Sequence, residues 1–420
     1  MTQEDNVSIR MYNIGFGDCF LLTFPAADRQ RKVLIDCGVH FLGHNKAQPF
    51  KDVLNQLIED IKENGEPKLD LVIATHRHQD HVSGFENDIW NTVEVGEVWM
   101  PWTENYQDKE AVRILLKQSR KAKKVNKLLE GILNNPLRFG LEHPEQIAEV
   151  KEIKGFSENS LTNPEAMEML HHGFKGGDKI KRRYLPYRDR EQNTMMPEIL
   201  PGVTVYLMGP SFDPEVIRDM EPPENEQWFR MMEDRIDPDR PLELPFNRDW
   251  SRKTLELANA DEILSEKDRR AIANVDAHTP FSVAKALEDA VNGTSLMMMF
   301  EIGKAFLFFP GDAQNGTWQS ALKDDKWLQL LTKTNFYKVG HHGSHNATPK
   351  EFVQKVLPPK CRAMISVYPV KIFENIPKNT LLEEMTVHQA EYVRSDTMIG
   401  QSDPPSFERT PLYVDTKIAI

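Results

Sequence analysis

The chain has 420 residues, of which 40% are hydrophobic and 28% charged, as is typical of a globular protein with a large core. Its formal net charge of −12 argues against a protein that coats nucleic acid through a global positive field. No apolar run is long enough for a membrane span, and the polar, acidic start does not resemble a secretory signal. The three cysteines lack C-x-x-C spacing, so we expect no disulfide framework and a cytoplasmic location.

The first hundred residues predict strands and a helix in an order typical of α/β proteins. A segment with apolar residues at helical spacing, PFKDVLNQLIEDIKENG, ends at Gly65. The predicted strands around it are VSIRMYNI, CFLLTFP, KVLIDCG, LDLVIAT and EVGEVWMP. Strands and helices that alternate with short connections indicate an α/β fold.

Two long charged segments interrupt this pattern. Residues 103–200 are predicted to be helical and basic, and residues 211–280 are charged and rich in proline. The strand PGVTVYLMGP lies between them. Loops this long usually serve as lids or partner surfaces. We therefore expect one domain over residues 1–420 that carries two surface insertions, through which it could bind a protein partner.

Strand character returns near residue 295. TSLMMMFEI and AFLFFPGD are predicted to form a hairpin around Gly303 and Lys304. NFYKVG then leads directly into HHGSHNATP, and RAMISVYPV adds a further strand. The rest of the chain is predicted to be a helix followed by extended chain.

The segment HRHQDH carries the strongest chemical signal. His76, His78, Asp80 and His81 place four potential metal ligands within six positions, directly after a predicted buried strand. Imidazole and carboxylate groups bind Zn²⁺, Mn²⁺ and Fe²⁺. A lone histidine is more often structural, but three of the thirteen histidines lie in this short segment, with an aspartate between them. The pattern favours a metal site.

Other polar residues also follow predicted strands. Asp312 ends AFLFFPGD, and His341 follows NFYKVG. A carboxylate at such a position can bridge two metal ions. Asp36 ends another strand, and we expect it to orient a histidine ligand. Sites at strand ends, on loops held by a rigid sheet, are common places for active sites.

The order of these motifs resembles the metallo-β-lactamase superfamily. VLIDCG, THRHQDH, FFPGD and VGHHGS occur in the family's order. YNIGFGDCFLLTFP, NGTSLMMMF, AFLFFPGDA and KVGHHGSHNATP are similar to the hydrolase domain of ComEC-type DNA-uptake proteins and their free-standing relatives. The resemblance covers roughly the first 100 residues and the stretch 291–370. It implies a four-layer αββα sandwich and an enzyme, a metal-dependent hydrolase.

The resemblance also implies a role for each ligand. Two divalent metal ions are expected, with zinc as the first choice and manganese as the alternative. His76 and His78 would bind the first ion, Asp80 and His81 the second, and Asp312 both. A histidine that the family often adds before the bridging aspartate is missing from VTVYLMGP. The remaining candidates for it are His143, His171, His172 and His278. The family's histidine–proline pair is also incomplete, because NIPKN has Pro377 without a preceding histidine.

The two histidines of HHGS leave one choice open. Successive side chains on an extended segment point to opposite faces, so only one of them should reach the metals. His341 directly follows the strand, and we expect it to be the ligand, with His342 as the alternative. His342 would then donate a proton to the leaving group or contact the substrate. The catalytic residues are thus predicted to be His342 and Asp80.

Three functions are compatible with these motifs. The favoured one is hydrolysis of a phosphodiester by a metal-bound hydroxide, on a small molecule or a nucleic acid, and includes a nuclease. The second is hydrolysis of a small carbonyl compound such as a thioester or lactam. The third is a non-catalytic interaction protein that keeps the fold. Basic residues in the first insertion could hold phosphates, but a solvated helix face is the favoured interpretation. They are Arg113, Lys117, Arg120, Lys121, Lys123, Lys124, Lys127, Lys179, Lys181, Arg182 and Arg183.

Overall fold

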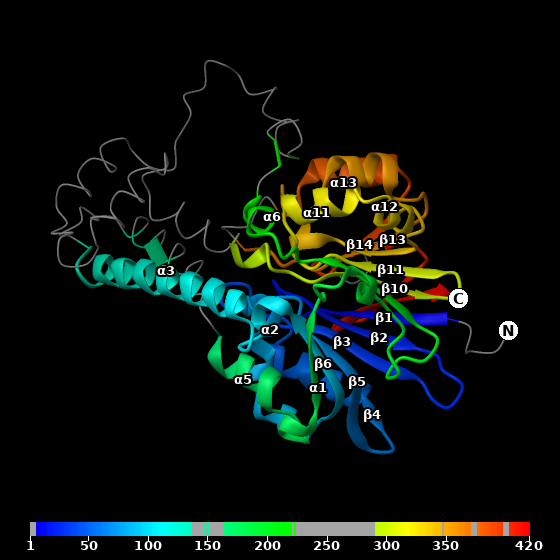
Figure 1. Ribbon diagram of the computed structural model, residues 1–420, viewed down its shortest axis with the longest axis horizontal. Coiled ribbons are helices and arrows are strands. Elements are labelled where there is room, and N and C mark those ends of the chain that lie inside the picture. Colours follow the sequence, from blue (N-terminus) through cyan, green and yellow to red (C-terminus); the bar gives the residue numbers. More distant parts are fainter. Residues whose placement is uncertain are drawn as a thin grey trace, which may run out of the picture.

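The computed structural model describes residues 6–136, 163–220 and 290–420, apart from 347, 371–375 and 398–402, and a few single positions between these ranges. Two β-sheets lie face to face, with helices on their outer faces (Figure 1). The fold is therefore an α/β sandwich, as the alternating pattern predicts. No helix in the described ranges combines the length and the apolar character needed to cross a membrane.

The described residues place nine strands in the first sheet. Its order is β15 (Phe407–Arg409), β16 (Tyr413–Ala419), β1 (Asn6–Tyr12), β2 (Cys19–Phe24), β3 (Arg31–Cys37), β5 (Glu66–Ile73), β6 (Glu94–Pro101) and β7 (Lys181–Leu185), with β4 (Lys62–Glu63) paired to β5. Strands β3, β5, β6 and β7 run parallel, and the pairs from β15 to β3 are antiparallel.

The second sheet has seven strands within the described ranges. Its order is β14 (Glu391–Arg394), β13 (Arg362–Ile365), β12 (Phe336–Lys338), β11 (Ala305–Phe309), β10 (Met297–Ile302), β9 (Thr204–Gly209) and β8 (Thr194–Met195). Strands β11 to β14 run parallel, and β8 to β11 are antiparallel. The predicted hairpin is confirmed, because Ile302 of β10 pairs with Ala305 of β11 across Gly303, whose φ is 58°.

The main core lies between the two sheets. Alternate residues of β1, such as Val7 and Ile9, face the core with no exposed surface. Met298 and Phe300 of β10 face it from the second sheet. The period of two along each strand places every second side chain on this inner face. Burial of these two apolar faces therefore holds the sheets together and fixes the position of their edges.

Helices cover both outer faces. The longer helices are α1 (Phe50–Asp60), α3 (Lys109–Asn134), α5 (Pro164–His172), α11 (Asn315–Leu322), α12 (Asp325–Leu331) and α13 (Asn379–Val387). Helices α1 and α5 pack on the first sheet, and α11, α12 and α13 pack on the second. Short helices are α2 (Gln79–Val82), α6 (Pro214–Arg218), the 3₁₀ segments Ser83–Glu86, Asp88–Thr92, Trp102–Glu104, Gly177–Lys179, Arg190–Asn193 and Gly340–Gly343, and the π-helical Phe352–Val356.

The expected first insertion is only partly an insertion. Its helical, basic part is present as α3. Its last part, however, adds β7 and β8 to the sheets, which the sequence did not predict. The sequence of β7 is polar and lacks the apolar alternation of a typical strand. Its charged residues Arg183 and Lys181 instead form ion pairs with Glu97 of the neighbouring strand β6. Most of the expected second insertion, residues 211–280, lies outside the described residues.

Candidate metal centre

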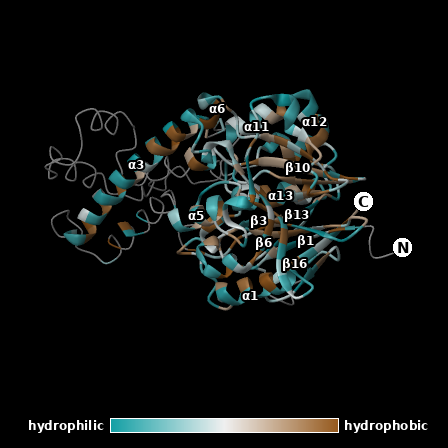
Figure 2. Cartoon of the chain, turned by 60° about the horizontal axis from the view of Figure 1, so that its bottom comes forward, coloured by the Kyte–Doolittle hydropathy of each residue, from teal (hydrophilic) through white to brown (hydrophobic). Residues whose placement is uncertain are grey.

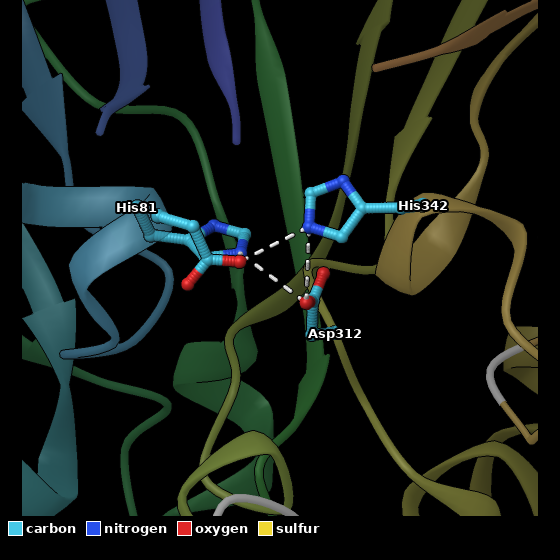
Figure 3. A group of neighbouring side chains, drawn as sticks. His81, Asp312 and His342 are labelled. Carbon is cyan, nitrogen blue, oxygen red and sulfur yellow. Dashed lines mark hydrogen bonds and ion pairs between the residues drawn. The ribbon is translucent and has the colours of Figure 1, made fainter. Parts of the chain in front are cut away.

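The candidate ligands come from the ends of three strands in two sheets. The HRHQDH segment follows β5 of the first sheet, while Asp312 follows β11 and His342 follows β12 of the second. Figure 3 shows His81, Asp312 and His342 pointing toward one another. Loops at the carboxyl ends of both parallel regions therefore meet at one place, which we call the site edge.

Four side chains form the tightest group. Asp80, His81, Asp312 and His342 are buried, and each offers one ligand atom within 4.8 Å of the others. Nε2 of His81 lies 3.2 Å from Oδ2 of Asp312, and Nε2 of His342 lies 3.1 Å from Oδ2 of Asp80. Two imidazoles and two carboxylates form a donor set that divalent transition metals accept. This group could bind a metal ion.

His76 and His78 lie beside this group but are not members of it. Nε2 of His76 lies 3.0 Å from Nδ1 of His78, and the ring centre of His76 lies 4.1 Å from that of His81. Nε2 of His78 and Oδ1 of Asp80 are buried without a hydrogen-bond partner among the described residues. Buried polar atoms normally have partners, so these two donor atoms fit a position for a cation.

The rings of His81 and His342 are each held in place by a contact to Nδ1. Nδ1 of His81 lies 2.8 Å from Oδ2 of Asp36, and the same oxygen accepts a hydrogen bond from the hydroxyl of Thr75 at 2.7 Å. Nδ1 of His342 lies 2.7 Å from the carbonyl oxygen of Ser366. Because Nδ1 is occupied, Nε2 of each ring faces the carboxylates. Histidines that bind metals are commonly oriented in this way. Asp36 thus contacts a candidate ligand, as the sequence predicts.

A buried lysine lies behind Asp312. Nζ of Lys338 lies 3.2 Å from Oδ1 of Asp312 and forms a second ion pair with Asp18. The backbone N–H of His341 donates to the same Oδ1 of Asp312 at 3.0 Å. One oxygen of Asp312 therefore faces an ammonium and an amide, and the other faces His81. Burial lowers the pKa of Lys338, but Asp18 and Asp312 raise it by more, so the ammonium stays charged.

Asp18 reaches the site from the loop between β1 and β2. Its N–H donates to the carbonyl oxygen of Asp80 at 2.9 Å, and its Oδ2 lies 3.6 Å from Nδ1 of His81. This approach needs a glycine at position 17, because a Cβ there would lie 2.1 Å from the oxygen of Gly38. The loop therefore packs directly on the HRHQDH segment.

The sequence did not predict Asp18 or Lys338 as site residues. Asp18 follows a glycine-rich turn, where aspartate is common for local reasons, so it carries no separate signal. Lys338 did carry one. It is the only charged residue in the strand segment NFYKVG, and lysine is rarely buried without a partner.

The electrostatic field of the group stabilises positive charge. Burial lowers the pKa of His81, but the carboxylates of Asp312, Asp80 and Asp36 raise it well above its ordinary value. Burial raises the pKa of Asp80, but His81 and His342 bring it well below the usual range. Without an ion, the carboxylates thus draw protons onto neighbouring imidazoles. A divalent cation would satisfy the same field.

The two adjacent histidines of HRHQDH behave differently. Burial lowers the pKa of His78 to about 3 and that of His76 well below its ordinary value. Both rings are therefore neutral near pH 7. The neutral imidazole is the form that binds a metal ion, so these two rings suit that role.

The HHGS segment differs from the expectation. His342, and not His341, belongs to the four-residue group. The alternation assumed for this segment is wrong, because both residues have left-handed backbone conformations, with φ of 44° and 55°, inside the turn Gly340–Gly343. His341 is only partly buried, with Nδ1 at 2.8 Å from Oγ of Ser344 and Nε2 at 3.3 Å from Nδ2 of Asn292.

The described residues supply no further histidine to the group. In α5, Nδ1 of His171 lies 3.0 Å from the hydroxyl of Tyr184, and that of His172 lies 2.7 Å from Asp178. The strand β9, in which the family's additional histidine was sought, ends without one. Two other candidates lie outside the described residues, namely His143 and His278.

The geometry defines a class of site rather than a particular protein: an α/β sandwich with a buried histidine and aspartate group that could bind a metal ion. Comparison with models of known protein families and with curated proteins gave no match.

Proposed function

We propose that this protein is a metal-dependent phosphodiesterase of the metallo-β-lactamase fold, and specifically a nuclease. The observation that carries the proposal is the buried group of Asp80, His81, Asp312 and His342 at the site edge. The two-sheet sandwich and the order of the motifs along the chain support the fold. The resemblance to the ComEC-type branch supports a phosphodiester substrate.

The donor set fits two divalent cations, with zinc as the first choice and manganese as the second. The residues that would hold them are His76, His78, Asp80, His81, Asp312 and His342. When bound, such ions act as Lewis acids and make a coordinated water more acidic. His342 replaces His341 in this set because its ring is the one that lies in the buried group.

The protein's other residues would position this machinery. Asp36 and the carbonyl of Ser366 hold the rings of His81 and His342 with Nε2 toward the carboxylates. Lys338 offsets part of the buried negative charge and leaves one oxygen of Asp312 for binding.

His341 would take the place beside the substrate that the sequence predicts for His342. Its ring is partly exposed, whereas that of His342 is buried, so a substrate that enters from solvent meets His341 first. The ring of His341 would contact the substrate, and the amide N–H of Asn292, which donates to Nε2 at 3.3 Å, would hold the ring in place.

A hydrolysis screen tests the proposal. The protein is stripped with a chelator, reloaded with Zn²⁺ or Mn²⁺, and assayed on bis-p-nitrophenyl phosphate, oligonucleotides, thioesters and lactams. We expect phosphodiester hydrolysis only after reloading. Hydrolysis of thioesters or lactams alone would instead support the carbonyl hydrolase. Bound metal without any hydrolysis would support an interaction protein.

A pair of variants connects activity to the site. Asp312→Asn should lower phosphodiester hydrolysis by about 100-fold or more, since even the outer contacts of metal ligands are worth about 10–100-fold. Asp178→Asn is the matched control, because Asp178 also contacts a histidine but is exposed on the surface. Equal activity in both variants would contradict the assignment.

A further inference from the structure

Helix α3 carries a line of basic side chains that the proposed chemistry does not use. The helix begins after Asp108, whose side chain caps it by accepting from two backbone N–H groups. Hydrophilic and hydrophobic residues alternate along α3, which runs outward from the two-sheet body (Figure 2). Arg113, Lys117 and Lys121 are four residues apart and exposed, so they lie on one side of the helix, about 6 Å apart along its axis.

A fourth cation comes from α6. Ile217 packs with Trp102 and Ala111 in a small apolar cluster, so α6 is fixed against the first turn of α3. The next residue, Arg218, is exposed. The positive charges of Lys121 and Arg218 lower the pKa of Lys117, so these cations are close enough to repel one another. We call Arg113, Lys117, Lys121 and Arg218 the basic ridge.

Within the part of the chain that the structure describes, few carboxylates pair with the basic ridge. Arg113 has a carboxylate of Glu110 at 3.9 Å, and the side chain of Arg113 is 71% exposed. Among the described residues, no ion pair involves Lys117, Lys121 or Arg218. Maintaining uncompensated like charges costs stability, although a solvated helix face remains the ordinary explanation for such a run. Position distinguishes the two explanations.

The ridge starts at the site edge. Trp102 follows β6, which runs parallel to β5, so it lies at the same edge of the first sheet as the HRHQDH segment. Helix α6 follows β9, and β9 and β11 run in the same direction because both are antiparallel to β10. Helix α6 therefore lies at the same edge of the second sheet as Asp312. A direct path of contacts also joins α6 to the site. A Cβ at Gly293 would lie 2.4 Å from the carbonyl oxygen of Ile217, and the neighbouring Asn292 contacts His341.

We propose that the basic ridge binds the backbone of a single-stranded nucleic acid and leads the strand to the metal centre. This inference rests on the proposed function. Cationic surfaces that follow a phosphate backbone are typical of single-strand binding. The four residues of the central group are at most 5% exposed, and a recessed group of this kind favours a flexible strand over a rigid duplex. The chain as a whole is acidic, so a local basic ridge is needed for such contact.

A charge-reversal experiment tests this. Binding of a fluorescent 20-nucleotide oligothymidylate to the full chain is measured by anisotropy in EDTA, so hydrolysis plays no part. The ridge variant combines Lys117→Glu, Lys121→Glu and Arg218→Glu. The control variant combines Lys304→Glu, Lys360→Glu and Lys417→Glu, three exposed lysines at the opposite ends of the strands with the same change in net charge.

We expect the ridge variant to bind at least 10-fold more weakly than the wild type and the control variant to bind within about twofold. The slope of log K against log salt should become shallower by about 2 in the ridge variant, at roughly 0.7 per lost phosphate contact. If the ridge variant fails to fold, Lys117→Gln and Lys121→Gln replace it, since both positions are exposed.

Equal weakening in both triple variants, no binding by the wild type, or equal affinity for duplex and single strand would overturn the proposal. Because binding is measured without metal, it can succeed even if the hydrolysis screen fails. The failure of the ridge and the failure of the proposed activity are thus distinguishable.

Discussion

Nε2 of His342 lies 3.1 Å from Oδ2 of Asp80, although 262 positions separate the two residues in the chain. This contact joins a loop of the second sheet to the HRHQDH segment of the first. The cluster can therefore form only when the two sheets are docked. A metal ion bound there would stabilise the docked state and so the whole fold.

The first prediction concerns the two histidines of HHGS. His342→Ala should lower the bound metal strongly, because it removes a buried ligand from the four-residue group. His341→Ala should keep the metal and lower turnover. Metal content by mass spectrometry and the rate of phosphodiester hydrolysis measure the two effects. Loss of metal in His341→Ala with retention in His342→Ala would restore the order expected from an extended chain.

The second prediction concerns Asp36. Asp36→Asn should weaken metal binding by about 10–100-fold, because the carboxylate at 2.8 Å orients the ring of His81. The fold should persist, because asparagine tolerates the left-handed backbone at this position, where φ is 56°. Competition with a fluorescent chelator measures the affinity. An unchanged affinity would mean that the contact does not orient the ring.

The third prediction concerns Lys338. Lys338→Met should destabilise the metal-free protein by about 3–5 kcal/mol, because it leaves Asp18 and Asp312 buried without their cation. Saturating Zn²⁺ should reduce this difference, since a divalent ion offsets the same carboxylates. Urea unfolding with and without metal measures both values. The same difference under both conditions would show that these carboxylates do not face the metal.

The fourth prediction concerns pH and lies outside the metal centre. Burial lowers the pKa of His171 to about 4, while the unfolded chain keeps a value near 6.5. At a pH between these two values, His171 is protonated in the unfolded state and neutral in the folded state. The stability contributed by the neutral ring is therefore present above pH 6.5 and lost as the pH falls toward 4, by about 3 kcal/mol at most.

His171→Phe provides the comparison for this effect, because phenylalanine keeps the stacking with Tyr106, whose ring centre is 4.5 Å away. The pH dependence of the unfolding free energy between pH 7 and 4 should be steeper in the wild type than in this variant. Identical curves would mean that His171 is not held neutral by the fold.

Much of this arrangement could be predicted from local patterns. The strand before His76 and the hairpin around Gly303 follow from runs of apolar residues and turn chemistry, and the structure contains both. The grouping of Asp80, His81 and Asp312 was expected because each follows a predicted strand. These features depend on a few neighbouring residues, so they can be predicted from short segments of the sequence.

The features that were missed depend on the rest of the fold. The pairing of β16 with β1 and of β7 with β6 joins distant segments, and nothing in either segment specifies its partner. His342 takes the place expected for His341 because both residues have left-handed backbone conformations. Non-glycine residues rarely adopt these conformations without tertiary constraint, so no local pattern in the sequence indicates them. Lys338 is charged in a buried strand only because Asp18 and Asp312 lie beside it.

The location of bound metal tests the central claim most directly. Crystals grown with Zn²⁺ or Mn²⁺ can be measured on both sides of the metal's absorption edge, so that an anomalous difference map locates each ion. We predict a peak bounded by Asp80, His81, Asp312 and His342. A map with no peak there, or with peaks only at surface pairs such as His172 and Asp178, would contradict the assignment of this cluster as a metal centre.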